Sequence, residues 1–297
     1  MVGAKIADTL LRLGYRVRVL SRQHPNVEMQ TEPHVEVIEG DLRDESTLIQ
    51  FFSGAELVFH CAAELQDQSL MWDINVEGTK TILNLCRAKK IKYFCYLSSA
   101  GVVGKTNESL VSEGSTCCPQ NMYERSKWAA EQLVNEGIED ASVVILRPTN
   151  VIDDEHPGAI LLGKRPGLKN RLKLLFKGGE SAHLVHAEDV ARTATYFIDS
   201  SFKQPECFFV SCDHELHNTF SGVAGVYQSR ILNKQGTSVS VPFYLPLFIP
   251  YLIRRLARGG GNIGSVKYSS KKLMDSGFSF KYGLKEMVDS VVLNDGK

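Results

Sequence analysis

Short apolar runs alternate along the chain with stretches of helical periodicity. Five runs rich in β-branched and aromatic residues have the length of strands, at 16–20, 35–38, 57–62, 93–97 and 143–146. Between them, apolar residues recur every three or four positions, as Ile6, Leu10 and Leu13 do before Gly14. Strands that alternate with helices are typical of a parallel sheet. The pattern therefore predicts an α/β fold with a doubly wound parallel sheet.

Polar residues follow two of the predicted strands directly. Ser98 and Ser99 come after the run at 93–97, and Arg-Pro-Thr-Asn at 147–150 comes after the run at 143–146. Ligands of doubly wound sheets bind at the carboxyl ends of the strands. We therefore expect both segments to line a common cleft.

Tyr123 and Lys127 form a candidate proton-transfer site. They lie four residues apart at the start of a helical pattern, so one helix face carries both side chains. A phenol with an ordinary pKa of about 10 is a poor acid or base at neutral pH, and an adjacent cation lowers that pKa. Tyr123 could then exchange a proton with a substrate hydroxyl or carbonyl. The spacing alone is common, so its weight depends on the rest of the sequence.

Seven short motifs occur in an order and spacing that together resemble a known family. They are Gly-Asp-Leu-Arg-Asp at 40–44, His-Cys-Ala-Ala at 60–63, Asn-Val-Glu-Gly-Thr at 75–79, Leu-Ser-Ser-Ala at 97–100, the Tyr123/Lys127 pair, Arg-Pro-Thr-Asn at 147–150, and Val-His-Ala-Glu-Asp-Val-Ala at 185–191. The chain resembles the extended short-chain dehydrogenase/reductases, within them the NAD(P)-dependent epimerase/dehydratase and 3β-hydroxysteroid-dehydrogenase-like group. Each motif alone is weak evidence, and the ordered set is strong.

The resemblance implies roles for individual residues. Tyr123 would be the acid/base, Lys127 would lower its pKa and bond the nicotinamide ribose, and Ser99 would hydrogen-bond the reacting oxygen. The residues implied near the cofactor are Gly3, Ser21, Arg22, Asp41, Leu42, Ala62, Ala63, Asn75, Lys127 and Pro148, with Ser99 and Asn150 implied at the substrate. Three of these motif residues have plain structural alternatives: Asp41 as a turn former, Ser98 as a packing residue and Asn75 as a partner of buried backbone groups.

The chain departs from the family at its beginning. Members begin with a strand and a Thr-Gly-x-x-Gly-Phe-[Ile/Val]-Gly turn, and here only Gly3 and the following helix match. The absent glycines allow a tight turn and close approach to the pyrophosphate. We expect either that the functional start lies upstream of Met1, which we favour because the rest of the site is intact, or that this is a shortened product with damaged cofactor binding.

The end of the run at 16–20, which takes the place of the family's second strand, bears on cofactor choice. An acidic residue there suits the ribose hydroxyl of NAD, and an arginine suits the 2′-phosphate of NADP. Ser21 takes the acidic place and Arg22 follows it. The sequence therefore favours NADP over NAD, with an ordinary solvated arginine as the alternative for Arg22.

Composition sets further bounds. With 297 residues and 43% hydrophobic content, the chain fits a dinucleotide-binding domain at 1–152 and a substrate-binding part at 153–297 that returns to the first domain near 181–200. The 34 basic and 34 acidic residues give no overall attraction to nucleic acid. Seven cysteines without metal-site spacing, in a chain with no signal peptide, indicate a cytoplasmic protein without a bound metal.

Two segments of the predicted substrate part have open interpretations. The basic loop at 163–171 could hold a diphosphate or could be a solvated face. The resemblance favours the diphosphate a little, because sugar-nucleotide enzymes of the family often have an asparagine at the place of Asn150. Within 241–258, an apolar stretch at 241–253 is followed by Arg254, Arg255 and Arg258, and it is too short and too rich in proline to cross a bilayer. We expect a lid or core segment there, with membrane contact as the less favoured alternative.

Three functions remain open. The first is an NAD(P)-dependent oxidoreductase that transfers hydride at a secondary alcohol or ketone carbon. The second is a nucleotide-sugar epimerase, which uses the same site. The third is a non-catalytic or truncated, inactive protein. A dehydratase is disfavoured because Ala100, not an acidic residue, follows Ser99. The resemblance also implies a possible homodimer through the helices that hold Asn75 and Tyr123.

Overall fold

The computed structural model describes residues 1–22, 32–164, 167–231, 243–258, 262 and 264–294. The chain folds as two compact units, each treated by itself below. The first unit comprises Met1–Gly104, Pro119–Arg147 and Ala191–Phe208, and the second comprises Lys105–Cys118, Pro148–Val190 and Phe209–Lys297.

Parallel strands form the framework of the first unit. A four-stranded sheet has the order β3 (Leu57–His60), β4 (Tyr93–Leu97), β6 (Ser142–Pro148) and β9 (Glu206–Val210). β1 (Val17–Ser21) and β2 (Val35–Glu39) form a second, two-stranded parallel sheet. β4 pairs in parallel with β3 on one side and with β6 on the other. The five predicted strands and the predicted parallel α/β fold are therefore confirmed.

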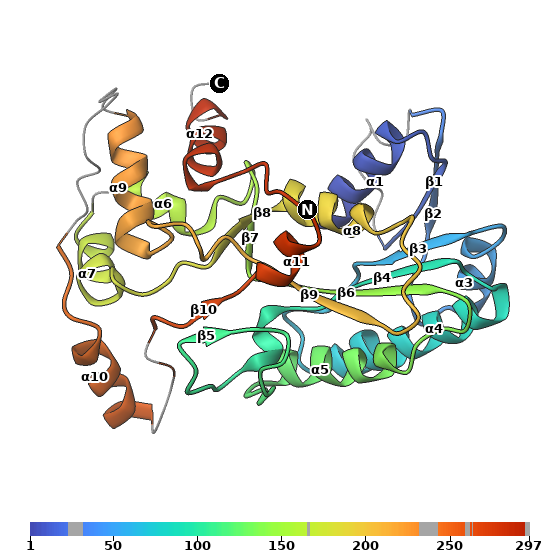
Figure 1. Cartoon of the computed structure of the whole chain (residues 1–297), viewed down its shortest axis with the longest axis horizontal. Helices are drawn as coiled ribbons and strands as arrows, with labels where there is room; N and C mark the ends of the chain where they lie inside the picture. The colour runs from blue at the N-terminus through green and yellow to red at the C-terminus, as the bar shows by residue number, and fades with distance from the viewer. Residues whose placement is uncertain (23–31, 165–166, 232–242, 259–261, 263, 295–297) are drawn as a thin grey trace. The chain divides into compact units, whose positions relative to one another are not determined.

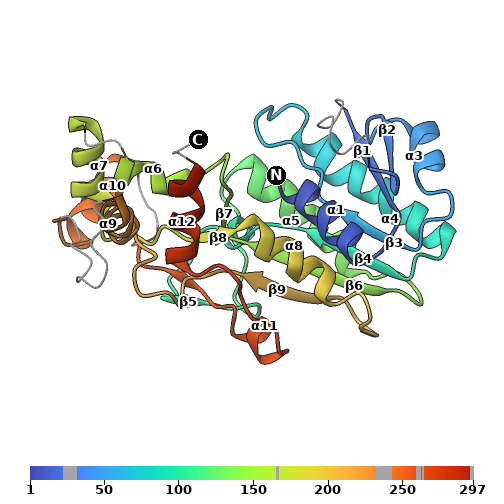
Figure 2. The same cartoon turned by 90° about the horizontal axis from the view of Figure 1, so that it is seen from above.

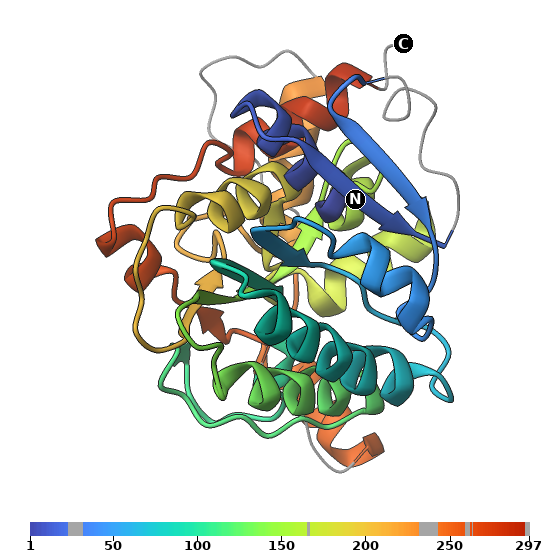
Figure 3. The same ribbon diagram turned by 90° about the vertical axis from the view of Figure 1, so that its right-hand side faces the viewer.

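Helices cover both faces of the four-stranded sheet (Figures 1 and 3). The helices of this unit are α1 (Val2–Arg12), α3 (Glu45–Phe51), α4 (Gly78–Lys89), α5 (Met122–Asn135) and the second half of α8 (Ala187–Tyr196). α4 and α5 lie on one face, and α1 and α8 lie on the other. Apolar residues of α4, β4 and β6 pack in a core that includes Leu83, Phe94 and Ile145.

Local capping fixes where α5 begins. The Asn121 side chain accepts a hydrogen bond from the Glu124 amide, and the Glu124 carboxylate accepts from the Asn121 amide, so the two residues form a capping box. α4 is preceded by a π-helical turn (Asp73–Glu77), and a short 3₁₀ turn (Ala100–Val103) follows β4. These boundaries set the positions of Asn75, Ser99 and Tyr123.

The second unit is mainly helical. Its helices include α6 (Leu161–Lys164), α7 (Leu168–Lys177), α9 (Phe220–Ile231), α10 (Phe248–Arg258), α11 (Lys271–Asp275) and α12 (Leu284–Asn294), several of which gather around α9 in Figure 2. β7 (Asn150–Ile152) pairs in parallel with β8 (Leu184–His186), and β5 (Leu110–Val111) pairs with β10 (Lys267–Tyr268). Within the described ranges, every helix is too short or too polar to cross a membrane.

Candidate active site

Ser99 and Tyr123 are brought together at the end of β4. Ser99 has an extended backbone and caps the 3₁₀ turn, where its Oγ accepts a hydrogen bond from the Gly101 amide at 3.1 Å. Tyr123 lies in the first turn of α5 and is half-buried. Burial raises the pKa of Tyr123 above its ordinary value, and a hydrogen bond with Ser99 acts in the opposite direction. The predicted neighbours therefore share one site.

Lys127 is buried one helical turn after Tyr123. Its Nζ donates a hydrogen bond of 2.6 Å to the Leu97 carbonyl oxygen and lies 4.2 Å from the centre of the Tyr96 ring. Burial lowers the pKa of Lys127 to about 7, because the charged form is poorly solvated there.

The pKa shifts of Tyr123 and Lys127 correct one expectation from the sequence. The sequence predicts that the Lys127 cation lowers that pKa, whereas the pKa is raised in this structure. The physical reason is that both groups are buried, which disfavours the Tyr123 phenolate and the Lys127 ammonium alike.

A buried ionic network lies on the same helix face, and sequence reasoning missed it. The Ser98 hydroxyl donates 2.6 Å to the Glu131 carboxylate, and Arg147 Nε lies 3.2 Å from both carboxylate oxygens. Arg147 also bonds Glu131 through Nη2, and all three residues are buried. Glu131 follows Tyr123 and Lys127 at the same spacing of four, and this spacing is the signal that could have found it.

Asn75 fixes the segment that follows β3. Its Oδ1 accepts from the Glu64 amide at 2.7 Å, and its Nδ2 donates to the Glu64 carbonyl at 3.0 Å and to Ser126 Oγ at 2.9 Å. Ala62 is exposed and Ala63 is half-buried just before Glu64. Asn75 therefore holds this segment against α5, in agreement with the structural alternative for Asn75.

His60 and Cys61 are not poised for chemistry. His60 Nε2 lies 2.9 Å from Thr79 Oγ1, whose hydroxyl donates to the Asn75 carbonyl at 2.6 Å. His60 must therefore be the donor in its contact with Thr79. Burial lowers the pKa of His60 to about 3 and raises the pKa of the Cys61 thiol to about 12, so both groups are neutral near pH 7.

The residues at the ends of β1 and β2 form a charged group. Arg43 bonds both carboxylate oxygens of Asp41, at 2.8 and 2.9 Å, and these bonds lower the pKa of Asp41 to about 2. Arg22 follows Ser21, is more than half exposed, and lies 3.7 Å from the Glu64 carboxylate. Leu42 is buried in the core instead.

Gly3 lies in the first turn of α1, beside the end of β3. A Cβ added to Gly3 would lie 3.7 Å from the Cys61 Cβ, which is ordinary contact. The first turn of α1 carries no acidic side chain. Its amide groups therefore present the positive end of the helix dipole without a competing carboxylate.

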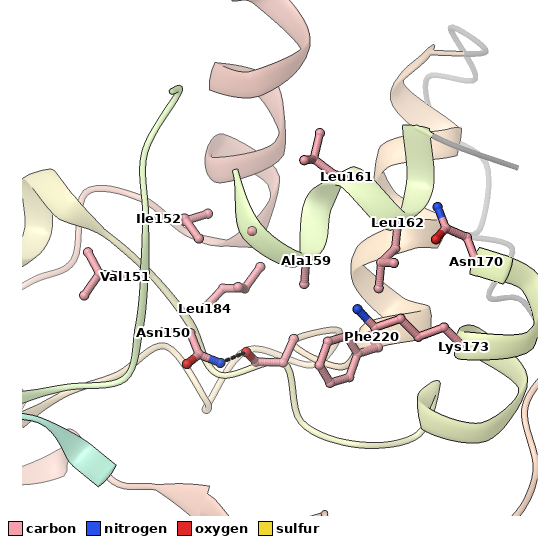
Figure 4. Close-up of a pocket in the computed structure, with 12 residues that line it drawn as sticks. Asn150, Val151, Ile152, Ala159, Leu161, Leu162, Asn170, Lys173, Leu184 and Phe220 are labelled. Atoms are coloured by element: carbon pink, nitrogen blue, oxygen red, sulfur yellow. Dashed lines mark hydrogen bonds between the residues drawn. The ribbon is translucent and has the colours of Figure 1, made fainter. Parts of the chain in front are cut away.

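Pro148 and Asn150 belong to the second unit. Pro148 is buried at the end of β6, and Asn150 is exposed in β7, with its Nδ2 donating 2.8 Å to the Ala182 carbonyl. Asn150 lines a pocket of about 390 Å³ in that unit. Figure 4 shows the apolar side chains of Leu161, Leu162 and Phe220 around it, with Lys173 reaching in from α7.

His183 and Asp213 form a second feature that the sequence did not suggest. His183 has a left-handed backbone with φ of 55°, which is uncommon outside glycine. Its Nδ1 lies 2.6 Å from the Asp213 carboxylate, which is buried. His183 stands between Ala182 and Leu184, two residues that line the pocket. No motif predicts this pair because its members are thirty residues apart.

Comparisons with known proteins identify the family and the fold. The sequence model of the NAD dependent epimerase/dehydratase family matches residues 1–210 of this chain. An N-acetyl-alpha-D-glucosaminyl-diphospho-ditrans,octacis-undecaprenol 4-epimerase of Escherichia coli O157:H7 is 25% identical, over 97% of this chain and 90% of that protein. A dihydroflavonol 4-reductase of Hordeum vulgare is 28% identical, over 98% of this chain and 85% of the reductase.

A solved structure shows the same fold. The enzyme WbmG of Bordetella bronchiseptica, in complex with NAD, has a TM-score of 0.74 and 22% identity, over 99% of this chain and 90% of that chain. Alignments with relatives span between 48% and 90% of the relatives' own lengths.

Proposed function

Because this chain belongs to the NAD dependent epimerase/dehydratase family, we propose that it is a nicotinamide-dependent oxidoreductase that acts on a secondary alcohol or ketone. The observation that carries the proposal is the meeting of Ser99 with Tyr123, one helical turn before the buried Lys127. In this proposal, Tyr123 exchanges a proton with the substrate oxygen, and Ser99 holds that oxygen by a hydrogen bond.

The residues present fit a dinucleotide cofactor. Lys127 gives one of its three ammonium donors to Leu97, so two remain to bond ribose hydroxyls. The first turn of α1, which contains Gly3, would face the diphosphate, because helix N-termini favour anions. Ala62 and Ala63 would border the dinucleotide with small side chains, in the segment that Asn75 holds in place. The bound cofactor supplies the nicotinamide ring that takes up or returns hydride.

The raised pKa of Tyr123 has a consequence for the direction of proton transfer. At neutral pH the phenol is protonated in the cofactor-free chain, so Tyr123 stands ready as a proton donor. Donation suits reduction of a ketone, in which the carbonyl oxygen gains a proton as its carbon gains hydride. Ser99 would polarise the same oxygen.

We further propose NADP as the preferred cofactor. The Arg22 side chain is more than half exposed at the end of β1, where a 2′-phosphate would bind. Its contact with Glu64 at 3.7 Å is long, so a phosphate could replace that carboxylate as its partner. Structural neighbours such as WbmG bind NAD, which stays the alternative.

The pocket in the second unit would hold the substrate. Most of its lining residues are apolar, and the side chains of Asn150, Asn170 and Lys173 supply its polar side-chain groups. This lining suits a substrate with an apolar body and a few polar or anionic groups. A nucleotide-sugar epimerase is the second candidate. The E. coli relative is named as a 4-epimerase of a sugar that a diphosphate joins to undecaprenol, and a nucleotide sugar carries a diphosphate in the same place, of which Lys173 could bind one phosphate.

Replacement of Tyr123 by phenylalanine tests the catalytic role. On any substrate found by screening ketones, alcohols and nucleotide sugars, Tyr123→Phe should lower turnover by roughly 10²–10⁴-fold, because it removes the proton donor. Its affinity for NADPH should stay unchanged. Tyr15→Phe, at an exposed tyrosine outside the site, is the matched control. Near-normal turnover in Tyr123→Phe would refute the proposal.

A further inference from the structure

We propose that α7 and α10 form a docking surface for an anionic phospholipid bilayer. The α7–α10 surface is defined by Leu168, Leu172, Phe176, Phe248, Leu252 and Leu256. The inference stands apart from the proposed catalytic function, because it rests on the outer faces of two helices.

α10 turns its apolar stripe outward. Phe248, Leu252 and Leu256 follow one another at intervals of four, so they lie along one helix face. Phe248 is 66% exposed and Leu256 is 80% exposed, whereas Pro250 on another face is buried. Surface helices of globular proteins usually turn such a stripe toward the core. Among the residues that the structure describes, none therefore buries the stripe of α10 as its sequence pattern would suggest.

α7 repeats the same arrangement. Leu168, Leu172 and Phe176 are also spaced by four, and all three are exposed, Leu168 to 75%. Leu174 lies on a different face and is buried in a small cluster with Leu162 and Ala224. This cluster packs α7 against the rest of the unit, so the exposed stripe does not take part in that packing.

The two helices are tied together locally. The Leu245 amide, just before α10, donates 2.8 Å to the Leu175 carbonyl of α7. Gly179, after α7, lies so close to Tyr244 that an added Cβ would come within 2.6 Å of the ring. Figures 1 and 2 both show α10 at the end of the second unit where α7 lies. The two stripes therefore belong to one region of the unit.

The positive charge of α7 and α10 favours an anionic membrane as the partner. Apart from Lys173, which lines the pocket, α7 contains three basic residues, and α10 also contains three. Neither helix contains an aspartate or glutamate, although the whole chain has a net charge of zero. Lysine and arginine beside an exposed apolar face are the pattern of helices that lie in the interface of anionic membranes. A second copy of this chain would bring like charges together, which disfavours a symmetric dimer through this surface.

The length of α10 means that this helix can lie on a bilayer but cannot cross it. α10 has eleven residues, which at about 1.5 Å per residue falls well short of the roughly 30 Å hydrocarbon core. The helix would lie in the plane of the interface with Phe248 and Leu256 among the acyl chains. Phe243, also exposed just before α10, would add to the apolar contact.

Vesicle co-sedimentation with the full chain tests the proposal. The chain should sediment with vesicles of phosphatidylcholine and phosphatidylserine, and much less with phosphatidylcholine alone. Leu256→Glu should weaken partitioning roughly tenfold or more, because it removes an inserted leucine and adds a charge of the wrong sign. Arg255→Glu should also weaken binding to the anionic vesicles, and added salt should do the same.

Leu216→Glu is the matched control. Leu216 is 81% exposed and lies outside both helices, so this variant should bind vesicles as the unaltered chain does. Thermal unfolding checks that every variant is folded, which we expect because the replaced side chains are exposed. Absence of binding to anionic vesicles, or equal losses in Leu256→Glu and Leu216→Glu, would overturn the proposal. So would self-association of the chain that Leu256→Glu abolishes, because the surface would then be a dimer interface.

Discussion

At Lys127, burial opposes the charge that the proposed mechanism uses. The side chain is 2% exposed, and its ammonium bonds one carbonyl oxygen and lies over one aromatic ring. Neither partner carries a full negative charge, so they offset the loss of hydration only in part, and the pKa falls to about 7. Ribose hydroxyls would give the ammonium further acceptors, so cofactor binding should favour its charged form.

A pH-dependent stability follows from this shift. The pKa of Lys127 is about 7 in the folded chain, against an ordinary 10.5. Between these values the unfolded chain binds a proton that the folded chain does not, so Lys127 destabilises the fold increasingly as the pH falls from about 10.5 to about 7. Urea unfolding near pH 7 and near pH 10 should show this dependence, and Lys127→Met should reduce it. Identical pH dependence in both proteins would contradict the assigned pKa.

Arg22 tests the choice of cofactor. Arg22→Ala should weaken NADPH binding by roughly tenfold or more and leave NADH binding nearly unchanged, because only NADPH carries the 2′-phosphate. Fluorescence titration with each cofactor measures both affinities. Arg125→Ala, at an exposed arginine of α5, is the control. Equal losses for both cofactors would remove the 2′-phosphate interpretation.

At the scale of elements, α5 organises the first unit's site. Three residues on one face of this helix have distinct surroundings: Tyr123 meets Ser99, Lys127 meets the end of β4, and Glu131 meets Arg147 of β6. The Glu131–Arg147 pair therefore anchors the helix to the sheet from inside. Such an anchor should matter for stability and, through the position of α5, for the site.

Removal of one member of this pair should be costly. Glu131→Ala leaves the buried Arg147 guanidinium without its carboxylate, and we expect a loss of about 3–5 kcal/mol in the free energy of unfolding. The double variant Glu131→Leu, Arg147→Met should lose less, because it buries no charge. Asp289→Ala, which removes the half-exposed Arg230–Asp289 pair, should cost at most about 1 kcal/mol. A single variant as stable as the Asp289 control would argue against a structural role for the pair.

At the scale of the whole molecule, the sequence predicted what local spacing determines. Each expected strand overlaps an observed one, because a short β-rich run is buried wherever the sheet forms. The meeting of Ser99 and Tyr123 also followed from motif order. The direction of the Tyr123 pKa and the Glu131–Arg147 pair were not predictable, because both depend on which side chains tertiary packing buries. The exposed stripe of α10 contrasts with the expected lid or core segment for the same reason, and the start of that segment, 241–242, lies outside the described residues.

Several expectations stay predictions. They are the boundary between a cofactor domain and a substrate part at residue 152, the preference for NADP, a diphosphate contact by residues 163–171, a homodimer and a cytoplasmic location. The expectation of a loop at 163–171 is wrong for its described part, because residues 163–164 end α6 and residues 168–171 begin α7, while residues 165 and 166 lie outside the described residues. The family is shown by the sequence comparison, and the parallel α/β fold is shown by the observed strands and by the similar solved structure.

Cofactor titration asks whether this chain binds a nicotinamide dinucleotide through Lys127. The chain and its Lys127→Met variant would each be titrated with NADPH and NADH by nicotinamide fluorescence, with circular dichroism recorded on the same samples. We expect saturable binding by the folded chain, and binding weaker by roughly tenfold or more in Lys127→Met because the ribose loses its ammonium donor. A folded chain that binds neither cofactor, or a variant that binds both as tightly, would contradict this expectation.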